Sequence, residues 1–185
     1  VFIGNPRTKK VEDFILNKKI ETLISVNYLF LIEQNLINLP SKIAFNVHGS
    51  LLPKYRGRTP HVWSIINNEH VTGITAHLID EGCDTGDIIE QVEVKIDYND
   101  TGNDILNKFK SLYSVIIDKV LNQVENDSFN LRAQNNESAT YFGKRVPDDG
   151  QIIWSWQKER IRNWVRALAF PYPGAFTFFD GVKII

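Results

Sequence analysis

The order of buried-type strands and amphipathic helices constrains the fold of this chain more than any other feature of its sequence. Residues 21–26 are typical of a buried strand, residues 29–39 of a short helix, and residues 42–47 of another buried strand. Upstream, residues 8–18 carry apolar side chains at helical spacing, after a short apolar run at residues 1–4. Repeated alternation of this kind is typical of parallel sheets whose faces are covered by helices.

Two further strands and a long helix complete this region. Residues 73–79 and 87–94 alternate apolar and polar side chains around a turn, which predicts paired strands. Asp100 and Thr101 can cap a long helix that follows, whose apolar side chains form one stripe. We therefore expect residues 1–125 to form an α/β domain with a Rossmann-like, mostly parallel sheet flanked by helices.

The composition shifts to Asn, Asp and Ser after residue 125, which predicts a separate C-terminal appendage at residues 126–185. Residues 126–151 are loop-rich, residues 158–168 form an amphipathic pattern, and residues 174–185 predict a β-hairpin. The hairpin is short and apolar, and such a unit is marginal in isolation. We expect it to pack between the subunits of a homodimer.

Composition and charge exclude several classes of protein. The chain has 185 residues, 43% of them hydrophobic, enough to bury a core of one large domain. Its 21 basic and 22 acidic residues give a net charge of -1, which provides no overall positive field for a nucleic acid or an anionic membrane. No segment reaches the roughly 20 apolar residues of a membrane span. The single cysteine, Cys83, cannot form an internal disulfide, which favours a cytoplasmic location.

Candidate catalytic side chains lie at the end of one strand and in one loop. Asn46 and His48 are two residues apart at the carboxyl end of the strand at 42–47, where open parallel sheets bind ligands, so both project to one face. The structural alternative is a capping asparagine and a packed histidine. Asp84 lies in an acidic, glycine-containing loop whose spacing does not match a calcium loop. We expect a turn with one functional carboxylate there, and no metal.

The remaining polar motifs are less specific. Lys54, Arg56 and Arg58 form a basic turn that can bind a phosphate or carboxylate, or can simply be solvated. His70 and His77 are expected to be structural or exposed. No nucleophile elbow, Walker loop or dinucleotide loop occurs in the sequence, so covalent catalysis, ATP hydrolysis and hydride transfer lack their usual markers.

Three ordered segments together resemble the core of folate-dependent formyltransferases. They are Asn-Val-His-Gly-Ser-Leu-Leu-Pro-Lys-Tyr-Arg-Gly at 46–57, Thr-Gly-Ile-Thr-Ala-His at 72–77 and Asp-Glu-Gly-Cys-Asp-Thr-Gly-Asp-Ile-Ile at 80–89. The resemblance implies 10-formyltetrahydrofolate as co-substrate and Asn46, His48 and Asp84 as catalytic residues. In that reading Asn46 donates to an oxyanion and His48 accepts the proton of an amine. Asp84 either orients and electrostatically supports His48 or positions a water that relays the proton to the folate nitrogen.

The C-terminal sequence resembles one branch of that family. Residues 140–150, 153–154, 161–167 and 171–176 are similar to the branch shared by methionyl-tRNA formyltransferases and nucleotide-sugar N-formyltransferases. The balanced charge favours a dTDP- or UDP-linked amino sugar, used for surface polysaccharide such as lipopolysaccharide O-antigen, over tRNA. The alternatives are methionyl-tRNA formylation and a non-catalytic folate or nucleotide-sugar binding protein.

The resemblance also implies binding residues and a longer protein. We expect the folate to contact Asn27, Tyr28, Glu81, Gly82, Cys83 and Asp84. We expect the sugar substrate to contact Ser50, Leu51, Arg56, Tyr141 and Trp154, with ordinary packing as the alternative for the two aromatic side chains. The family's first βαβ unit, about 50 to 70 residues long, is expected to precede Val1.

Overall fold

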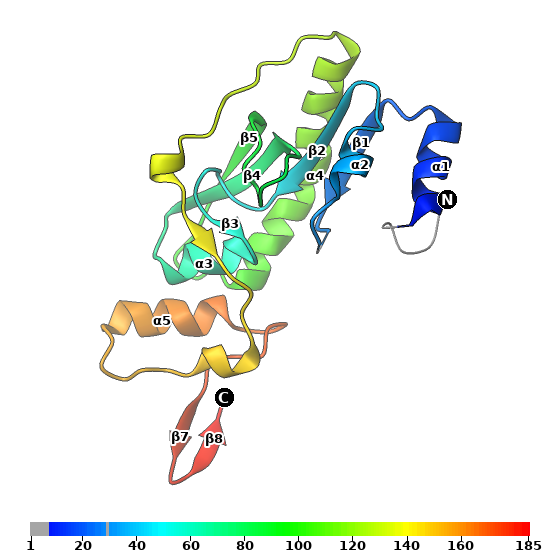
Figure 1. The fold of residues 1–185 in the computed structure, drawn as a ribbon. Coiled ribbons are helices and arrows are strands. Elements are labelled where there is room, and N and C mark those ends of the chain that lie inside the picture. The colour runs from blue at the N-terminus through cyan, green and yellow to red at the C-terminus, as the bar shows by residue number, and fades with distance from the viewer. Residues whose placement is uncertain (1–7, 29) are drawn as a thin grey trace.

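The computed structural model describes residues 8–28 and 30–185. Within them, four strands form one sheet in the order β1-β2-β4-β5 (Figure 1). These strands are β1 (Thr22–Val26), β2 (Ile43–His48), β4 (Val71–Leu78) and β5 (Ile88–Lys95). The apolar run at residues 1–4, which is typical of part of a strand, lies outside the described residues.

The sheet is mixed rather than mostly parallel over the described residues. β1 pairs with β2 in parallel, whereas β2 with β4 and β4 with β5 pair antiparallel. For β4 and β5 the physical reason is the short connection, because a short loop joins antiparallel neighbours and a parallel pair needs a long crossover. The α/β class, the helices that flank the sheet and the paired strands at 73–79 and 87–94 are confirmed.

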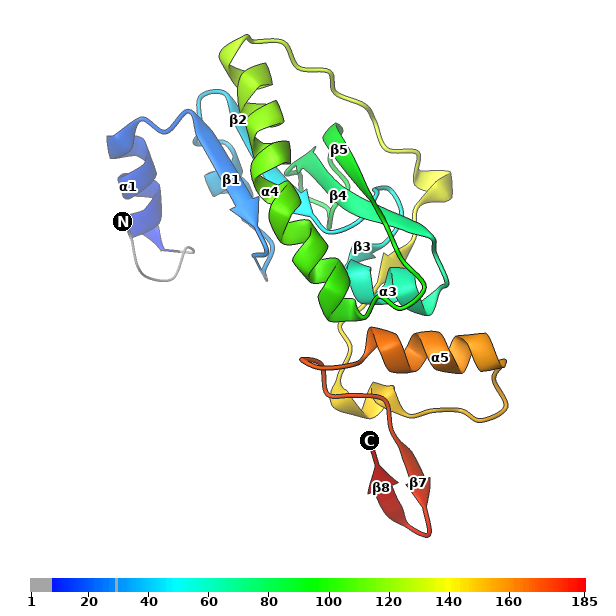
Figure 2. The ribbon, with the colours of Figure 1, turned by 180° about the vertical axis from the view of Figure 1, so that it is seen from behind.

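One long helix covers a face of the sheet. α4 (Gly102–Glu125) crosses β4 and β5, as Figure 2 shows from behind. It begins at Thr101, whose hydroxyl accepts the amide N–H of Asp104 while the Asp104 carboxylate accepts the amide N–H of Thr101. Its apolar stripe forms a core with the sheet, and each such buried side chain stabilises the fold by about 1.5–3 kcal/mol. The fully buried members include Ile105, Phe109, Ile116 and Val120 of α4 with Phe45 and Ile74 of the sheet.

Shorter elements complete the main body, by which we mean the four-stranded sheet and the elements around it up to Glu125. They are α1 (Lys9–Lys18), α2 (Gln34–Ile37), the two-residue β3 (Arg56–Gly57) and α3 (Pro60–Ile66). α1 stands beside β1 in both ribbon views. The helix expected at 29–39 is confined to α2, because residues 30–32 line a cavity instead. Among the described residues, no helix is long and apolar enough to cross a membrane.

The C-terminal segment returns to the main body before it ends in a helix and a hairpin. Arg132 exchanges backbone hydrogen bonds with Ile88 of β5, and β6 (Tyr141–Phe142) pairs with β3. α5 (Lys158–Ala167) packs on α3, and Trp164 joins the core that the sheet and α4 form. The expected helix and β-hairpin are confirmed, whereas the domain boundary at residue 125 stays a prediction. The remaining elements are the short 3-10 helices η1 (Asn136–Ser138) and η2 (Pro147–Gly150) and the hairpin strands β7 (Thr177–Phe179) and β8 (Val182–Ile184).

Candidate active site

Polar side chains from two neighbouring strands meet on one face of the sheet. Asn46 and His48 lie at the carboxyl end of β2, and the antiparallel register places His77 of β4 directly opposite Asn46. Directly opposed residues of paired strands project to the same face. Asn46, His48 and His77 therefore share a face, and the loop that follows β4 brings Asp84 to them.

The hydrogen bonds of His48 define which of its nitrogens can take up a proton. Nε2 lies 2.8 Å from the carbonyl oxygen of Tyr55. A carbonyl oxygen only accepts, so Nε2 carries a hydrogen and donates it. Nδ1 lies 3.4 Å from Oδ1 of Asp84. In the neutral ring, Nδ1 is therefore the nitrogen that is free to accept a proton.

Asp84 is held by the backbone of a neighbouring segment. Its Oδ2 accepts the amide N–H of Gly57 at 2.9 Å, and its own backbone has a φ of 58°, a conformation uncommon outside glycine. Gly57 has a φ of 98°, and a Cβ there would lie 2.3 Å from the carbonyl oxygen of Phe142. Only glycine fits at position 57, so the amide that holds Asp84 depends on this residue.

His77 completes the cluster: this histidine, expected to be structural or exposed, is buried beside Asn46 and Asp84. Its Nδ1 lies 2.7 Å from the carbonyl oxygen of Leu78, and its Nε2 lies 3.5 Å from Oδ1 of Asp84 and 3.2 Å from Nδ2 of Asn46. The alternation of residues 73–79 placed His77 in a strand. Nothing in the sequence gave the register with Asn46, on which its position depends.

Burial and mutual charge set the ionisation of this cluster. Burial lowers the pKa of His48 below its usual value; Asp84 and the Tyr55 carbonyl counter this in part, and His77 adds to the lowering. Burial would raise the pKa of Asp84, but the hydrogen bond with His77, the charge of His48 and the Gly57 amide outweigh it and hold that pKa well below its usual range. Near neutral pH the site thus pairs a neutral His48 with an ionised Asp84, as general base catalysis requires.

These groups open onto a cavity of about 530 Å³ at the carboxyl ends of β1 and β2. Its size is within the range of small-molecule sites. Apolar and aromatic side chains form much of its wall, and they include Tyr28, Phe30, Leu31, Ile79, Phe109 and Tyr113. Asn46, His48, His77 and Asp84 also line it. Within residues 8–28 and 30–185, no cluster of three or more His, Cys, Asp or Glu side chains is arranged to hold a metal ion.

Most of the residues expected to contact folate line this cavity. Asn27, Tyr28, Gly82 and Cys83 do so together with Asp84, whereas Glu81 is exposed and is not part of the wall. Asn27 has a φ of 54° and accepts a hydrogen bond from the Tyr113 hydroxyl at 3.3 Å. Tyr141, expected to contact the sugar, also lines the cavity. Their roles in binding stay predictions.

The other residues expected to contact the sugar lie away from the cavity. Arg56 is buried, and its guanidinium donates to the side-chain oxygens of Gln134 and Asn136 at 2.8 and 2.9 Å. Gln134 in turn donates to the carbonyl oxygens of Asp84 and Gly86, so Arg56 supports the Asp84 loop from behind. The Arg56 guanidinium is thus engaged inside the protein, and the expected contact of Arg56 with substrate stays a prediction.

Ser50, Leu51 and Trp154 are not part of the cavity wall either, and their contact with the sugar stays a prediction. The Ser50 hydroxyl is buried and donates to the Lys54 carbonyl at 2.7 Å, and Leu51 is half-buried in the same loop. Trp154 is exposed in the C-terminal segment, where its indole N–H donates to Thr177 at 2.9 Å. The sequence could not distinguish these internal partners from a ligand.

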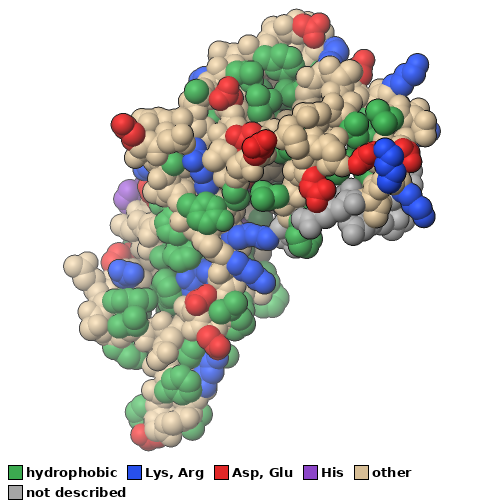
Figure 3. Space-filling view, viewed as in Figure 1, with side chains coloured by type: hydrophobic (Ala, Val, Ile, Leu, Met, Phe, Trp, Pro, Cys, Tyr) green, Lys and Arg blue, Asp and Glu red, His purple; other side chains and the backbone are tan. Residues whose placement is uncertain are grey.

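A second cavity, of about 420 Å³, adjoins the first where the main body meets the C-terminal segment. Phe30, Arg58 and Thr59 line both cavities, and Thr59 has a φ of 48°. Such a conformation is an outlier for a β-branched residue, and strained residues of this kind cluster at functional sites. Lys144 and Arg145 add positive charge to the second cavity. Lys and Arg side chains gather near this junction on the face that Figure 3 shows.

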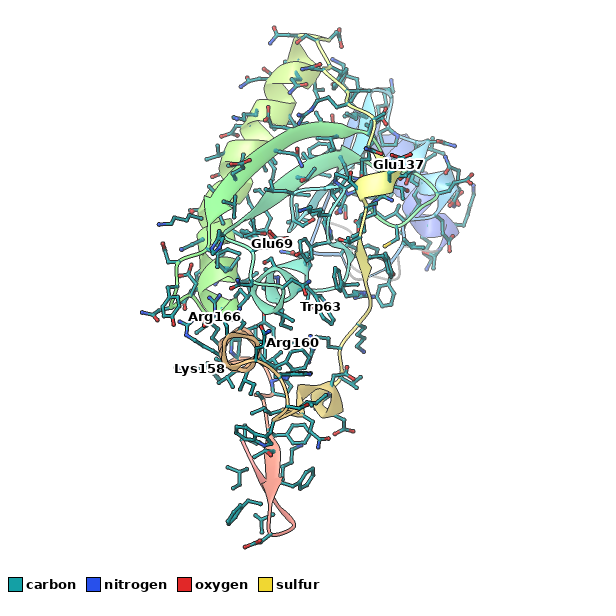
Figure 4. All side chains as sticks on the ribbon, turned by 90° about the vertical axis from the view of Figure 1, so that its left-hand side faces the viewer. Trp63, Glu69, Glu137, Lys158, Arg160 and Arg166 are labelled. Carbon is teal, nitrogen blue, oxygen red and sulfur yellow. The ribbon has the colours of Figure 1, made fainter. Side chains whose placement is uncertain are left out.

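Aromatic rings hold Arg145, and also His61 between the two cavities. The Arg145 guanidinium lies 4.4 Å from the ring centroid of Trp164 and 5.1 Å from that of Trp63. Figure 4 shows Trp63 near the junction with α5. Between the two cavities, buried His61 forms a short hydrogen bond with the hydroxyl of Tyr172. Burial, reinforced by the charge of His48, lowers the pKa of His61 to about 4. Arg145 and His61 therefore join the C-terminal segment to the main body.

Comparison with known families identifies the class of this fold and site. Residues 5–121 match the family described as formyl transferase, and residues 144–185 match the formyl transferase C-terminal domain. The chain belongs to the formyl transferase family.

Individual relatives agree with that family. The chain is 35% identical over 173 residues to the bifunctional polymyxin resistance protein ArnA of Wigglesworthia glossinidia brevipalpis, covering 94% of the chain and 26% of that protein. The N-formyltransferase of Helicobacter canadensis, solved with folinic acid and dTDP-3-aminofucose, is 29% identical with a TM-score of 0.75, covering 92% of this chain and 64% of that one. A 4-N formyltransferase from Francisella tularensis is 27% identical with a TM-score of 0.81, covering 95% and 73%. The chain thus spans about a quarter of the curated relative and less than two thirds of the Helicobacter enzyme.

Proposed function

We propose that this protein transfers the formyl group of 10-formyltetrahydrofolate to the amine of a nucleotide-linked amino sugar. The observation that carries the proposal is the arrangement of His48, Asp84 and Asn46 at the cavity. A neutral imidazole, an ionised carboxylate and an amide are the groups that formyl transfer to an amine needs. The Helicobacter enzyme, whose structure contains folinic acid and a dTDP-linked amino sugar, supports the choice of both substrates.

The residues present fit a formyl folate. The cavity wall offers aromatic rings such as Tyr28, Phe109 and Tyr113 to a flat conjugated ring, and the catalytic cluster lies in the same wall. We infer that Asn27, Tyr28 and the backbone of residues 82–84 contact the folate. The apolar lining excludes water, which strengthens the electrostatic interactions of the site.

His48 and Asn46 divide the chemistry between them. As the amine nitrogen bonds to the formyl carbon, its proton passes to Nδ1 of His48, since Nε2–H is already donated to Tyr55. Asn46 donates an amide N–H to the oxyanion that develops on the formyl oxygen, a contact worth about 3–4 kcal/mol in comparable sites. The bond from the formyl carbon to the folate nitrogen then breaks, and that nitrogen takes the proton from Nδ1 of His48, which returns the imidazole to its neutral form.

The geometry favours one of the two roles considered for Asp84. Because neutral His48 carries its hydrogen on Nε2, Asp84 receives no N–H from it before the reaction. Once Nδ1 has taken the proton, an N–H and a positive charge face Oδ1 of Asp84. We therefore infer that Asp84 stabilises the imidazolium.

The second cavity supports a nucleotide diphosphate in the acceptor. Arg58 lines both cavities and Lys144 lines the second. We infer that the diphosphate binds between these two cations while the sugar amine reaches His48. A dTDP or UDP carrier and a role in surface polysaccharide such as O-antigen are part of the proposal, as is a cytoplasmic location.

The apolar hairpin supports a homodimer. Phe178, Phe179 and Val182 are 55%, 67% and 63% exposed, respectively. Exposed apolar side chains that cluster on one small element mark an interaction site. We infer that two copies associate through β7 and β8.

A panel of acceptors tests the function. The full chain is incubated with 10-formyltetrahydrofolate and dTDP- or UDP-linked amino sugars, or with charged initiator tRNA, and products are analysed by mass spectrometry. We expect one formyl group on an amino sugar. Formylation of tRNA alone would establish the methionyl-tRNA activity instead, and no product with any amine would favour a binding protein.

A further inference from the structure

His77 is fixed at both of its ring nitrogens. Nδ1 lies 2.7 Å from the Leu78 carbonyl oxygen, so the ring is anchored to the backbone of its own strand. A bulge between Ala76 and His77 interrupts the β4–β5 pairing at this residue. The side chain is 3% exposed. The hydrogen bond at Nδ1 therefore fixes the direction in which the other nitrogen, Nε2, points.

That other nitrogen contacts two groups of the reaction at once. Nε2 lies 3.2 Å from Nδ2 of Asn46 and 3.5 Å from Oδ1 of Asp84. Asn46 is the proposed oxyanion donor and Asp84 the proposed partner of the imidazolium. Because Nδ1 carries the ring hydrogen and donates it to the Leu78 carbonyl, Nε2 has a lone pair that accepts an N–H of Asn46. The Asn46 amide is thus fixed beside Asp84.

His48 and His77 approach the same carboxylate oxygen from two strands. Each ring bonds a backbone carbonyl through one nitrogen and directs the other at Oδ1 of Asp84, at 3.4 and 3.5 Å. The ring centroids are 6.4 Å apart. A change at His77 therefore reaches His48 through Asp84 and through the charge of the second imidazole.

We propose that His77 is a positioning residue for formyl transfer, whose Nε2 accepts an N–H of the Asn46 amide and so fixes that amide beside the Asp84 carboxylate. The inference rests on the proposed function and adds a residue to it. Misplacing catalytic groups by about 1 Å can cost about 100-fold in rate. His77 itself need not touch either substrate for this effect.

Three substitutions separate positioning from packing. The amide of glutamine reaches the place of Nε2, whereas that of asparagine reaches only the place of Nδ1. We expect His77→Gln to keep kcat within about 10-fold of wild type and His77→Asn and His77→Ala to lower it about 100-fold, with KM for the folate unchanged. Equal kcat for the Gln and Asn variants, or wild-type kcat for His77→Ala, would overturn the proposal. His70→Gln, at an exposed histidine, is the matched control.

A second readout does not depend on turnover. The titratable groups that face His48 are Asp84, His77 and, from α3, His61. Because His77 lowers the pKa of His48, we expect an imidazole NMR titration to show a higher His48 pKa in His77→Gln than in wild type. If the His48 pKa is the same in both proteins, the inference is overturned, whether or not an acceptor is formylated. If the His48 pKa differs but the wild-type protein formylates no acceptor, only the proposed function is contradicted.

Discussion

Replacing Asp84 by asparagine removes the charge that faces His48 while it keeps the shape of the side chain. The asparagine oxygen can still accept the Gly57 amide N–H, which Asp84 binds at 2.9 Å. What is lost is the attraction between an anionic oxygen and Nδ1 of a protonated His48, 3.4 Å away. At an effective dielectric constant of about 20, two unit charges at that distance attract by about 5 kcal/mol, a ceiling because both charges are delocalised.

The kinetic consequence follows from when that charge pair forms. It exists only after His48 has taken the amine proton, so its loss raises the barrier rather than weakening substrate binding. The ceiling of about 5 kcal/mol corresponds to somewhat more than 1,000-fold, and we expect Asp84→Asn to lower kcat by about 100- to 1,000-fold. Steady-state formyl transfer to the amino sugar measures kcat, and equilibrium titration measures the folate Kd.

Two results would refute this reasoning. A kcat within a few-fold of wild type would show that Asp84 does not stabilise the imidazolium. A normal kcat with a much weaker folate Kd would place Asp84 in binding alone. Asp118→Asn removes an exposed carboxylate from α4 and should leave both constants unchanged.

Further expectations concern the backbone, the pH dependence of stability and the dimer. Gly57→Ala should destabilise the fold by about 2 kcal/mol or more, seen as a lower Tm, because its φ is 98° and its Cβ would meet the Phe142 carbonyl; an unchanged Tm would contradict this. His61 has a folded pKa of about 4 against 6.5 unfolded, so the unfolded chain binds more protons between these values. Stability should therefore be full above pH 6.5 and fall by about 3 kcal/mol towards pH 4, and urea titrations of His61→Asn should lack that part of the loss. Phe179→Glu should turn a dimer into a monomer by light scattering, and a wild-type monomer at micromolar concentration would contradict the proposed interface.

The sequence was sufficient to predict the elements whose signals are local. The apolar stripe and the cap at Thr101 predicted α4, and the two-residue period of a strand placed Asn46 and His48 on one face. Both signals depend on residues a few positions apart. For that reason they do not depend on how distant segments pair.

What could not be predicted depends on register and on single backbone angles. His77 belongs to the site only because β4 pairs antiparallel with β2 at Asn46. Arg56 and Arg58 are two residues apart and looked equivalent, but Gly57 between them has a φ of 98°. That angle breaks the alternation, so Arg56 enters the protein and Arg58 lines the cavities.

The most direct test of the proposed reaction follows the formyl carbon itself. The protein is given 10-formyltetrahydrofolate with a ¹³C-labelled formyl group and a dTDP- or UDP-linked amino sugar, and the label is located by NMR. We predict that wild-type protein moves the label onto the sugar nitrogen, and that His48→Ala binds the folate but does not transfer the label. Label that stays on the folate with the wild type, or moves equally well with His48→Ala, would contradict the proposed function and its mechanism.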